Sequence, residues 1–126
     1  MELSNQAIGR AGEFQAAAIF ERHGVVTTHV DVHGVDLWCE TPTGRRVTIQ
    51  VKASQRAALD SHHATPRYHF NLREAANADV YCFVALDLSL LRLRSLGELP
   101  DSKGIRLGVS QFTEADMLAD LKRYLY

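Results

Sequence analysis

The chain has 126 residues, of which 46% are hydrophobic and 23% are charged, an ordinary composition for a globular domain. No stretch approaches the roughly 18 to 20 uncharged apolar residues of a membrane helix, and Met1 begins no basic and apolar leader. Two cysteines, Cys39 and Cys82, are too few and too far apart for a zinc knuckle or a CxxC pair. These features predict a single cytoplasmic domain over residues 1–126 with reduced thiols.

The net charge is −1, from 14 Lys and Arg against 15 Asp and Glu, whereas a dedicated nucleic-acid binder usually has a basic excess. The charges are unevenly distributed along the chain. Residues 1–44 carry 2 basic and 6 acidic side chains, residues 45–73 carry 6 and 1, and residues 74–126 carry 6 and 8. A basic surface in the middle segment is therefore compatible with the overall sum.

The first predicted element is an amphipathic helix over residues 5–23, with Gly24 just past its end. Gly9 and Gly12 lie inside this helix, and each costs about 1 kcal/mol relative to alanine. We therefore expect another segment to pack closely against them. Glu13 shares a helix face with small and apolar residues, where an acid is unusual, although a position at the border of the face would also explain it.

Strands are predicted where apolar or β-branched residues dominate or alternate with polar ones, namely at 25–30, 34–40, 45–53, 80–86 and 90–94. Residues 54–70 are predicted as a loop and 71–77 as a short helix. The last helix opens at Thr113 and carries leucines on one face, at Leu118, Leu121 and Leu125. The order α-β-β-β-α-β with a closing helix predicts a mixed α/β fold, with a central mixed sheet flanked by helices.

The hairpin between the second and third strands has two distinct faces. Its Pro42-Thr43-Gly44 loop pairs Thr41 with Arg45, so that opposed residues have numbers summing to 86. One face is apolar and carries Val35, Leu37, Cys39, Val47, Ile49, Val51 and Ala53. The other is polar and carries Asp36, Trp38, Glu40, Arg46, Thr48, Gln50 and Lys52. The polar face could simply meet solvent, as in many antiparallel sheets.

One end of the polar face has the composition of a catalytic site. The pairing places Asp36 opposite Gln50, and Gly34 opposite Lys52, where the glycine leaves open space. Carboxylate and amide oxygens suit Mg²⁺, which lowers the pKa of bound water and screens a phosphodiester. A lysine can orient or deprotonate the attacking water or stabilise charge on phosphate. Glu13 is the candidate for a second carboxylate at this metal.

These residues together resemble the PD-(D/E)XK nuclease superfamily, especially archaeal-type Holliday junction resolvases and group I intron-encoded endonucleases. The likeness spans about residues 7–87, and its motifs are Gly-Arg-Ala-Gly-Glu-Phe, Gly-Val-Asp-Leu and Ile-Gln-Val-Lys. It implies a restriction-endonuclease-like fold, Asp36, Glu13 and Gln50 as ligands of Mg²⁺ (with Mn²⁺ able to substitute), and Lys52 as the catalytic lysine. Gln50 stands where the family usually has Asp or Glu, which leaves one negative charge fewer at the metal.

Basic, aromatic and hydroxyl side chains around the predicted loop are candidates for contact with DNA, namely Arg45, Arg46, Ser54, Arg56, Arg67, Tyr68 and His69. A solvated loop would also explain Ser54 and Arg56, and a half-buried strand would explain Tyr68. His62 and His63 match no zinc pattern and are predicted as loop histidines. Trp38 is expected to pack under another chain or against the first helix.

The predicted function is that of a Mg²⁺-dependent DNA endonuclease, resolvase-like or homing-endonuclease-like, in a prokaryotic or phage-type cytoplasm near the nucleoid. A short chain has little surface for a long DNA site, so a homodimer or higher homo-oligomer is the expected working unit. The alternative is a catalytically inactive nuclease-fold module for DNA binding or subunit assembly, which Gln50 and the slight acidity favour. A small-molecule enzyme is disfavoured, because the sequence has no Gly-rich phosphate loop or nucleophile motif.

Overall fold

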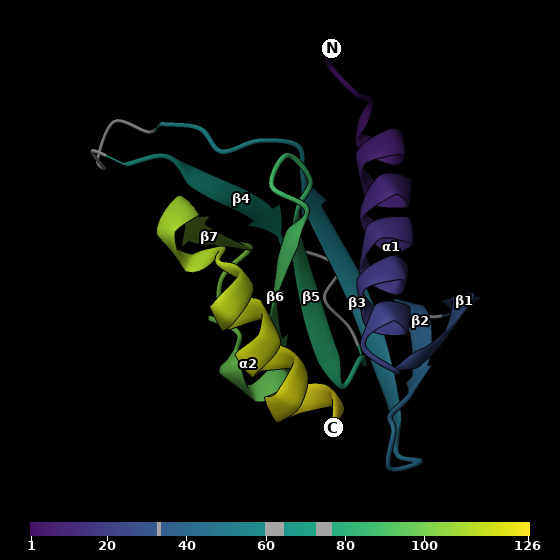
Figure 1. Cartoon of the computed structure of the whole chain (residues 1–126). Helices are drawn as coiled ribbons and strands as arrows, with labels where there is room; N and C mark the ends of the chain where they lie inside the picture. The colour runs from purple at the N-terminus through teal and green to yellow at the C-terminus, as the bar shows by residue number, and fades with distance from the viewer. Residues whose placement is uncertain (33, 60–64, 73–76) are drawn as a thin grey trace.

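The structure is a computed structural model that describes residues 1–32, 34–59, 65–72 and 77–126 (Figure 1). Helix α1 spans Asn5–Arg22 and helix α2 spans Glu114–Leu125. The strands are β1 (Val26–Val32), β2 (Val35–Glu40), β3 (Arg46–Ser54), β4 (Arg67–Asn71), β5 (Val80–Ala85), β6 (Leu90–Ser95) and β7 (Gly104–Gly108). Short 3₁₀ turns follow β6 and β7, at Leu96–Glu98 and Val109–Gln111. Neither helix is long and apolar enough to cross a membrane, among the residues described.

The central sheet has the strand order β1-β2-β3-β5-β6. Its first three strands are antiparallel, β3 and β5 are parallel, and β5 and β6 are antiparallel. Strands β4 and β7 pair with each other in a separate two-stranded sheet, the β4–β7 ribbon. The predicted mixed α/β class with a central mixed sheet is therefore confirmed.

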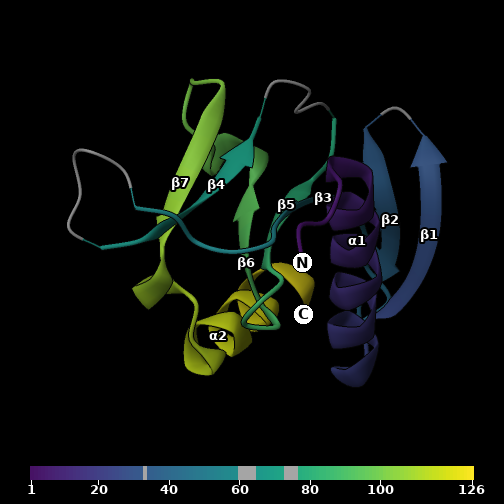
Figure 2. The same cartoon turned by 90° about the horizontal axis from the view of Figure 1, so that it is seen from above.

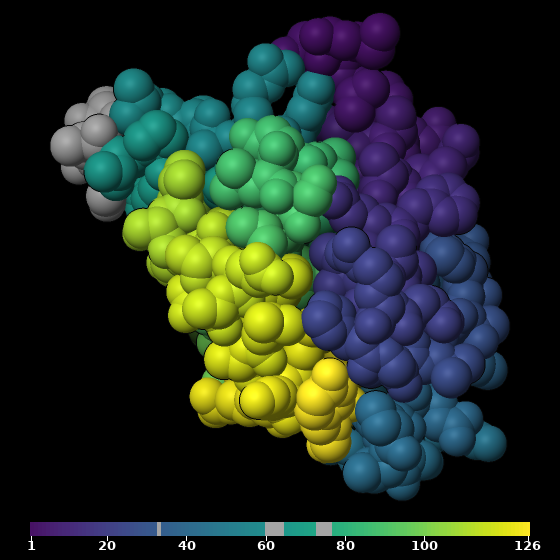
Figure 3. Space-filling view, viewed as in Figure 1, coloured from purple at the N-terminus to yellow at the C-terminus, as the bar shows by residue number. Residues whose placement is uncertain are grey.

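Different layers cover the two faces of the central sheet. Helices α1 and α2 lie side by side on one face (Figure 3), and the β4–β7 ribbon lies on the other (Figure 2). The helix side buries residues such as Phe20 and Leu121 against alternate residues of β5, including Cys82. The ribbon side buries Phe70 against the intervening residues, including Phe83. The described helices thus flank the sheet on one face only, and β5 is buried at every position.

The β2–β3 hairpin has the predicted register, with Leu37 opposite Ile49 and Trp38 opposite Thr48. Gly44 takes a φ of +86°, the left-handed conformation that its place in the turn requires. The predicted alternation is wrong at Val35, however. Val35 is buried in the ribbon-side core, whereas Leu37, two residues on, is buried in the helix-side core. Strand β2 therefore changes its facing around Asp36.

The sequence prediction also differs from the structure in the crossover between β3 and β5. Asn71 ends strand β4 and does not begin a helix, while residues 73–76 lie outside the described residues. Strand β7 was not predicted, and β4 starts inside the predicted loop. On α2, Leu121 and Leu125 are buried as predicted, but Leu118 is exposed and Met117 is buried in its place.

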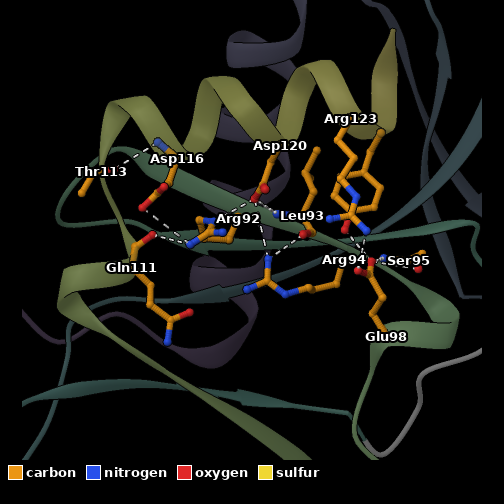
Figure 4. Close-up of polar contacts among 11 residues, drawn as sticks. Arg92, Leu93, Arg94, Ser95, Glu98, Gln111, Thr113, Asp116, Asp120 and Arg123 are labelled. Carbon is orange, nitrogen blue, oxygen red and sulfur yellow. Dashed lines mark hydrogen bonds and ion pairs between the residues drawn. The ribbon is translucent and has the colours of Figure 1, made fainter.

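Helix α2 is anchored to β6 by a partly buried ionic cluster (Figure 4). Oδ2 of Asp120 accepts hydrogen bonds from the backbone N–H of Leu93 at 2.9 Å and from Nε of Arg92 at 2.8 Å. Arg92 also donates to the carbonyl oxygen of Gln111 at 2.7 Å. Charge-assisted bonds of this kind fix both the position and the rotation of the helix against the sheet.

Candidate functional site

Of the two glycines inside helix α1, Gly12 positions the helix beside the sheet. A Cβ on Gly12 would lie 2.5 Å from the Cβ of Ala53, so the helix backbone lies directly against β3. Gly9, one turn earlier, has no atom within 4 Å of its would-be Cβ. The prediction of a close approach is therefore confirmed for Gly12 and wrong for Gly9. The close contact at Gly12 holds the following residue, Glu13, near the ends of β1 and β2.

The first turns of α1 and the facing ends of β1 and β2 enclose an open pocket of about 370 Å³, called here the acidic pocket. It is lined by Asn5, Gln6, Gly9, Arg10, Glu13, Val30, Asp31 and Asp36. The structure thus brings together Glu13 and Asp36, two residues singled out in the sequence. Asp31 is a third acid, which the sequence did not indicate because β1 has no clear alternation of polar and apolar residues.

The acids of this pocket repel one another. Burial, followed by the nearby Asp36 and Asp31, raises the pKa of Glu13 to about 7 against the opposing effect of Arg10. Burial also raises the pKa of Asp36, although the N–H of Val51 and the Lys52 ammonium oppose that shift. Carboxyl groups that are costly to ionise together are expected to accept a proton or a cation.

Asp36 is fixed at the point where β2 separates from β3. The paired register begins at Leu37, and in place of a further cross-strand pair the Oδ2 of Asp36 accepts a hydrogen bond from the N–H of Val51 at 2.7 Å. In the parallel β3–β5 pairing, Gln50 and Lys52 align with Tyr81 and Phe83, residues of the ribbon-side core. The Asp36 carboxylate therefore lies between Gln50 and Lys52 along β3, with Glu13 approaching from the helix side.

Gln50 is only 7% exposed, and its Oε1 has no hydrogen-bond partner among the residues that the structure describes. Buried side-chain oxygens are normally paired, so the unpaired oxygen of Gln50, the residue before Val51, needs an explanation. An amide oxygen without a donor can coordinate a cation.

Within the described ranges, no three His, Cys, Asp or Glu side chains are grouped to hold a metal ion. The donors that fit here are two carboxylates, Glu13 and Asp36, together with the Gln50 amide oxygen. This set of hard oxygen donors has the chemistry that Mg²⁺ prefers.

The candidate DNA contacts in the hairpin turn lie far from the acidic pocket. Arg45 donates to the carbonyl oxygen of Tyr124 at 2.7 Å and so caps the end of α2. Arg46 lies directly opposite Glu40 in the β2–β3 register, beside the turn. Arg46 and Lys52 are six positions apart in β3, a distance of about 20 Å along the strand. The structure therefore does not bring these two arginines to the predicted site.

The candidates after β3 have partners within the chain. Arg56 forms an ion pair with Glu2, and the Ser54 hydroxyl donates to the Arg56 carbonyl oxygen at 3.2 Å. Both pairs are exposed, so neither is expected to hold its residue tightly.

The prediction that Tyr68 contacts DNA is wrong, because this side chain is buried in the ribbon-side core. Its ring packs edge-on against Phe112, and its hydroxyl donates to Asp87 at 2.7 Å. Burial, followed by the bond to Asp87, raises the pKa of the Tyr68 hydroxyl. His69, the next residue, is exposed on the opposite face of β4.

Three other predicted residues have different outcomes. His62 and His63 lie outside the described residues. Trp38 is 52% exposed on the face of the sheet away from α1, so the prediction that it packs against the first helix is wrong. Its alternative, contact with another chain, stays a prediction.

No family model matches this chain, and no curated protein matches it. Among solved structures, it is similar to a bacterial homing endonuclease, I-Ssp6803I, with a TM-score of 0.67 and 16% sequence identity. The match covers 84% of this chain and 76% of the other. The two proteins therefore share an α/β fold found in a nuclease.

Proposed function

We propose that this chain is a divalent-metal-dependent DNA endonuclease of the PD-(D/E)XK type, which hydrolyses phosphodiester bonds. The observation that carries the proposal is the position of Asp36, which lines the acidic pocket together with Glu13 and lies close enough to Lys52 for the ammonium group to oppose the rise in its pKa. The fold shared with a homing endonuclease supports it. The motif resemblance adds Gln50 as the proposed third ligand, and its buried oxygen, unpaired among the described residues, supports this part of the proposal.

Each residue has a distinct part in the proposed reaction. A bound Mg²⁺ would supply Lewis-acid stabilisation and an activated water. Glu13, Asp36 and Gln50 would hold it, and the N–H of Val51 keeps the Asp36 carboxylate in place. Lys52 would orient the attacking water or stabilise the charge that develops on the phosphate.

The competing proposal is a nuclease fold that binds DNA without cutting it. Gln50 favours this alternative, because a neutral ligand leaves only Glu13 and Asp36 to balance the charge of the metal. Resolvase-like and homing-endonuclease-like activities differ in the DNA that is cut, so the substrates of the test must include both a plain duplex and a four-way junction.

We also propose that the working unit is a homodimer formed through the exposed surface around Trp38. An open groove of about 370 Å³ runs across β1, β2 and β3 on this face, and Val26 beside it is also exposed. Glu40 and Arg46 line the same groove, so a two-fold axis that passes between them would place the acid of one copy opposite the arginine of the other. Light scattering on the Trp38→Ser variant tests this: a dimer that becomes a monomer supports it, and a monomeric wild type contradicts it.

The decisive experiment is a nicking assay on supercoiled plasmid and on a synthetic four-way junction, each in Mg²⁺, Mn²⁺ or EDTA. Wild type is compared with Lys52→Ala, Asp36→Ala and a control, Lys122→Ala, which removes an exposed lysine of α2. We expect metal-dependent nicking by wild type and the control, and a loss of at least 100-fold in the two site variants. DNA binding without metal-dependent nicking of either substrate would support the inactive module instead.

A further inference from the structure

The outer face of the β4–β7 ribbon is a polar surface that the proposed catalytic site does not use. Its inner positions are buried or, at Ile105, partly buried, whereas three cross-strand pairs lie on the outer face: Arg67 with Gly108, His69 with Arg106, and Asn71 with Gly104. Two of the three pairs contain a glycine, so only the central pair carries two side chains. Few side chains therefore project from the outer face, and Arg106 and His69 lie at its centre.

The central pair holds Arg106 in a defined orientation. Nε of Arg106 donates to Nδ1 of His69 at 3.2 Å. The two terminal nitrogens of Arg106 form no hydrogen bond or ion pair with the residues that the structure describes. A guanidinium fixed through Nε keeps two parallel N–H donors free, the arrangement that pairs with N7 and O6 of guanine.

The charge and width of the β4–β7 ribbon fit the major groove of duplex DNA. Neither strand contains an acidic residue, and Lys103 offsets Asp101 in the turn before β7. Two paired strands with their side chains are about 10 Å across, which suits a groove about 12 Å wide but not the minor groove, about 6 Å wide. The major groove of double-stranded RNA is too narrow for such a ribbon.

The β4–β7 ribbon also lies on the side of the sheet to which Gln50 and Lys52 belong. Phe70 of β4 packs edge-on against Phe83 of β5, with ring centres 5.0 Å apart, and Phe83 aligns with Lys52 in the β3–β5 pairing. This rigid contact gives the ribbon a fixed position relative to the proposed catalytic residues.

We infer that the outer face of the β4–β7 ribbon reads base edges in the major groove of double-stranded DNA, with Arg106 as a residue that determines sequence preference. The inference rests on the proposed function, because it names how the same enzyme would choose its DNA site.

The test is selection from a pool of duplexes with a randomised centre, followed by affinity measurements on the selected and on random duplexes in Mg²⁺. All proteins carry Lys52→Ala, so that the DNA is not cut. This parent is compared with Arg106→Ala and Arg106→Lys, and with Arg22→Ala, which removes an exposed arginine of α1. Thermal unfolding checks that each variant folds.

We expect both Arg106 variants to lose about 10-fold to 100-fold in affinity for the selected duplex, because one bidentate contact to a base is removed. Arg106→Lys keeps the positive charge but not the planar fork, so its affinity for random duplex should stay within about threefold of the parent. Arg22→Ala should keep the preference of the parent.

Three outcomes would overturn the inference alone: no preferred sequence for the parent, equal losses on selected and random duplex, or an undiminished preference in Arg106→Lys. Binding to double-stranded RNA as tight as to DNA would also overturn it. If wild type neither nicks nor binds any DNA, the proposed function fails together with the inference.

Discussion

The carboxylate of Asp36 accepts a hydrogen bond from the backbone N–H of Val51, with 2.7 Å between Oδ2 and N. This side-chain bond takes the place of a cross-strand backbone bond where β2 leaves β3. It makes one residue both a structural link between two strands and a part of the proposed catalytic site.

The two roles of Asp36 are separable by substitution. Asp36→Asn keeps an oxygen that can accept from Val51 and removes a costly charge, so we expect its free energy of unfolding to equal or exceed that of wild type. Asp36→Ala leaves the N–H unpaired and should cost about 1 to 2 kcal/mol. Urea unfolding in EDTA measures both, and both variants should lose nicking activity. Equal stabilities for the two variants would show that the bond to Val51 contributes nothing.

Glu13 should make the stability of the metal-free protein depend on pH. Its pKa is about 7 in the folded protein, against 4.5 for the ordinary side chain, so the unfolded chain ionises first as the pH rises. The free energy of unfolding should therefore fall between about pH 4.5 and pH 7 and level off above. A shift of this size corresponds to about 3 kcal/mol, and screening at this partly exposed carboxyl reduces the expected change to about 1 kcal/mol. Glu13→Gln should remove this part of the slope in urea unfolding from pH 5 to 8.

Replacement of Gln50 by methionine should raise stability and lower activity. The side chain is buried and its Oε1 is unpaired among the described residues, so a thioether of similar length avoids an unsatisfied oxygen. We expect a gain of about 1 kcal/mol in EDTA and a loss of at least tenfold in metal-dependent nicking. The matched variant Gln50→Glu should be less stable than wild type in EDTA. Its Tm should rise more than that of wild type when Mg²⁺ is added. A stability loss in Gln50→Met would mean that the amide is satisfied in solution.

The glycines of α1 should respond in opposite ways to alanine. A Cβ at position 12 would overlap the Cβ of Ala53, which cannot rotate away, so Gly12→Ala should cost about 1 to 3 kcal/mol despite the better helix propensity of alanine. At position 9 there is open space, and Gly9→Ala should add about 0.5 to 1 kcal/mol. Chemical denaturation of both variants checks the pair. Equal effects would mean that α1 does not lie against β3 in solution.

The ionic cluster under α2 should depend on one of its two aspartates. Asp120→Ala removes the carboxylate that is hydrogen-bonded to Arg92, whose side chain is only 14% exposed, and should cost about 3 kcal/mol. Asp116 lies 4.0 Å from the same arginine and is half exposed, so Asp116→Ala should cost under about 0.5 kcal/mol. Thermal unfolding distinguishes them, and comparable losses would contradict the assignment of Asp120 as the anchor.

Local signals in the sequence were sufficient for the hairpin and both helices. The Pro42-Thr43-Gly44 turn sets the register, because the side-chain period of two leaves no other pairing that buries one face. Likewise, Thr113 accepts from the N–H of Asp116 as the N-cap of α2. Glu13 was singled out because an acid is unusual on an apolar helix face, and Asp36 because the same register places it near Gln50 and Lys52 on the polar face.

Features that depend on distant segments could not be predicted. Strand β7 buries only Leu107 fully and has no strong pattern of its own, and its partner β4 alternates over only five residues. Asp31 enters the acidic pocket only because α1 packs across β1. The change of facing after Val35 accompanies the burial of this valine in the ribbon-side core, while Leu37 is buried in the helix-side core.

The connectivity of the β4–β7 ribbon has a consequence for the order of folding. Residues paired between β2 and β3 are 6 to 12 positions apart in the chain, whereas those paired between β4 and β7 are 33 to 41 apart. The entropy of loop closure delays such distant pairings until other contacts have shortened the chain. The hairpin that carries Asp36, Gln50 and Lys52 is therefore expected to form early, whereas the β3–β5 pairing, with residues 31 positions apart, and the ribbon are expected to follow it.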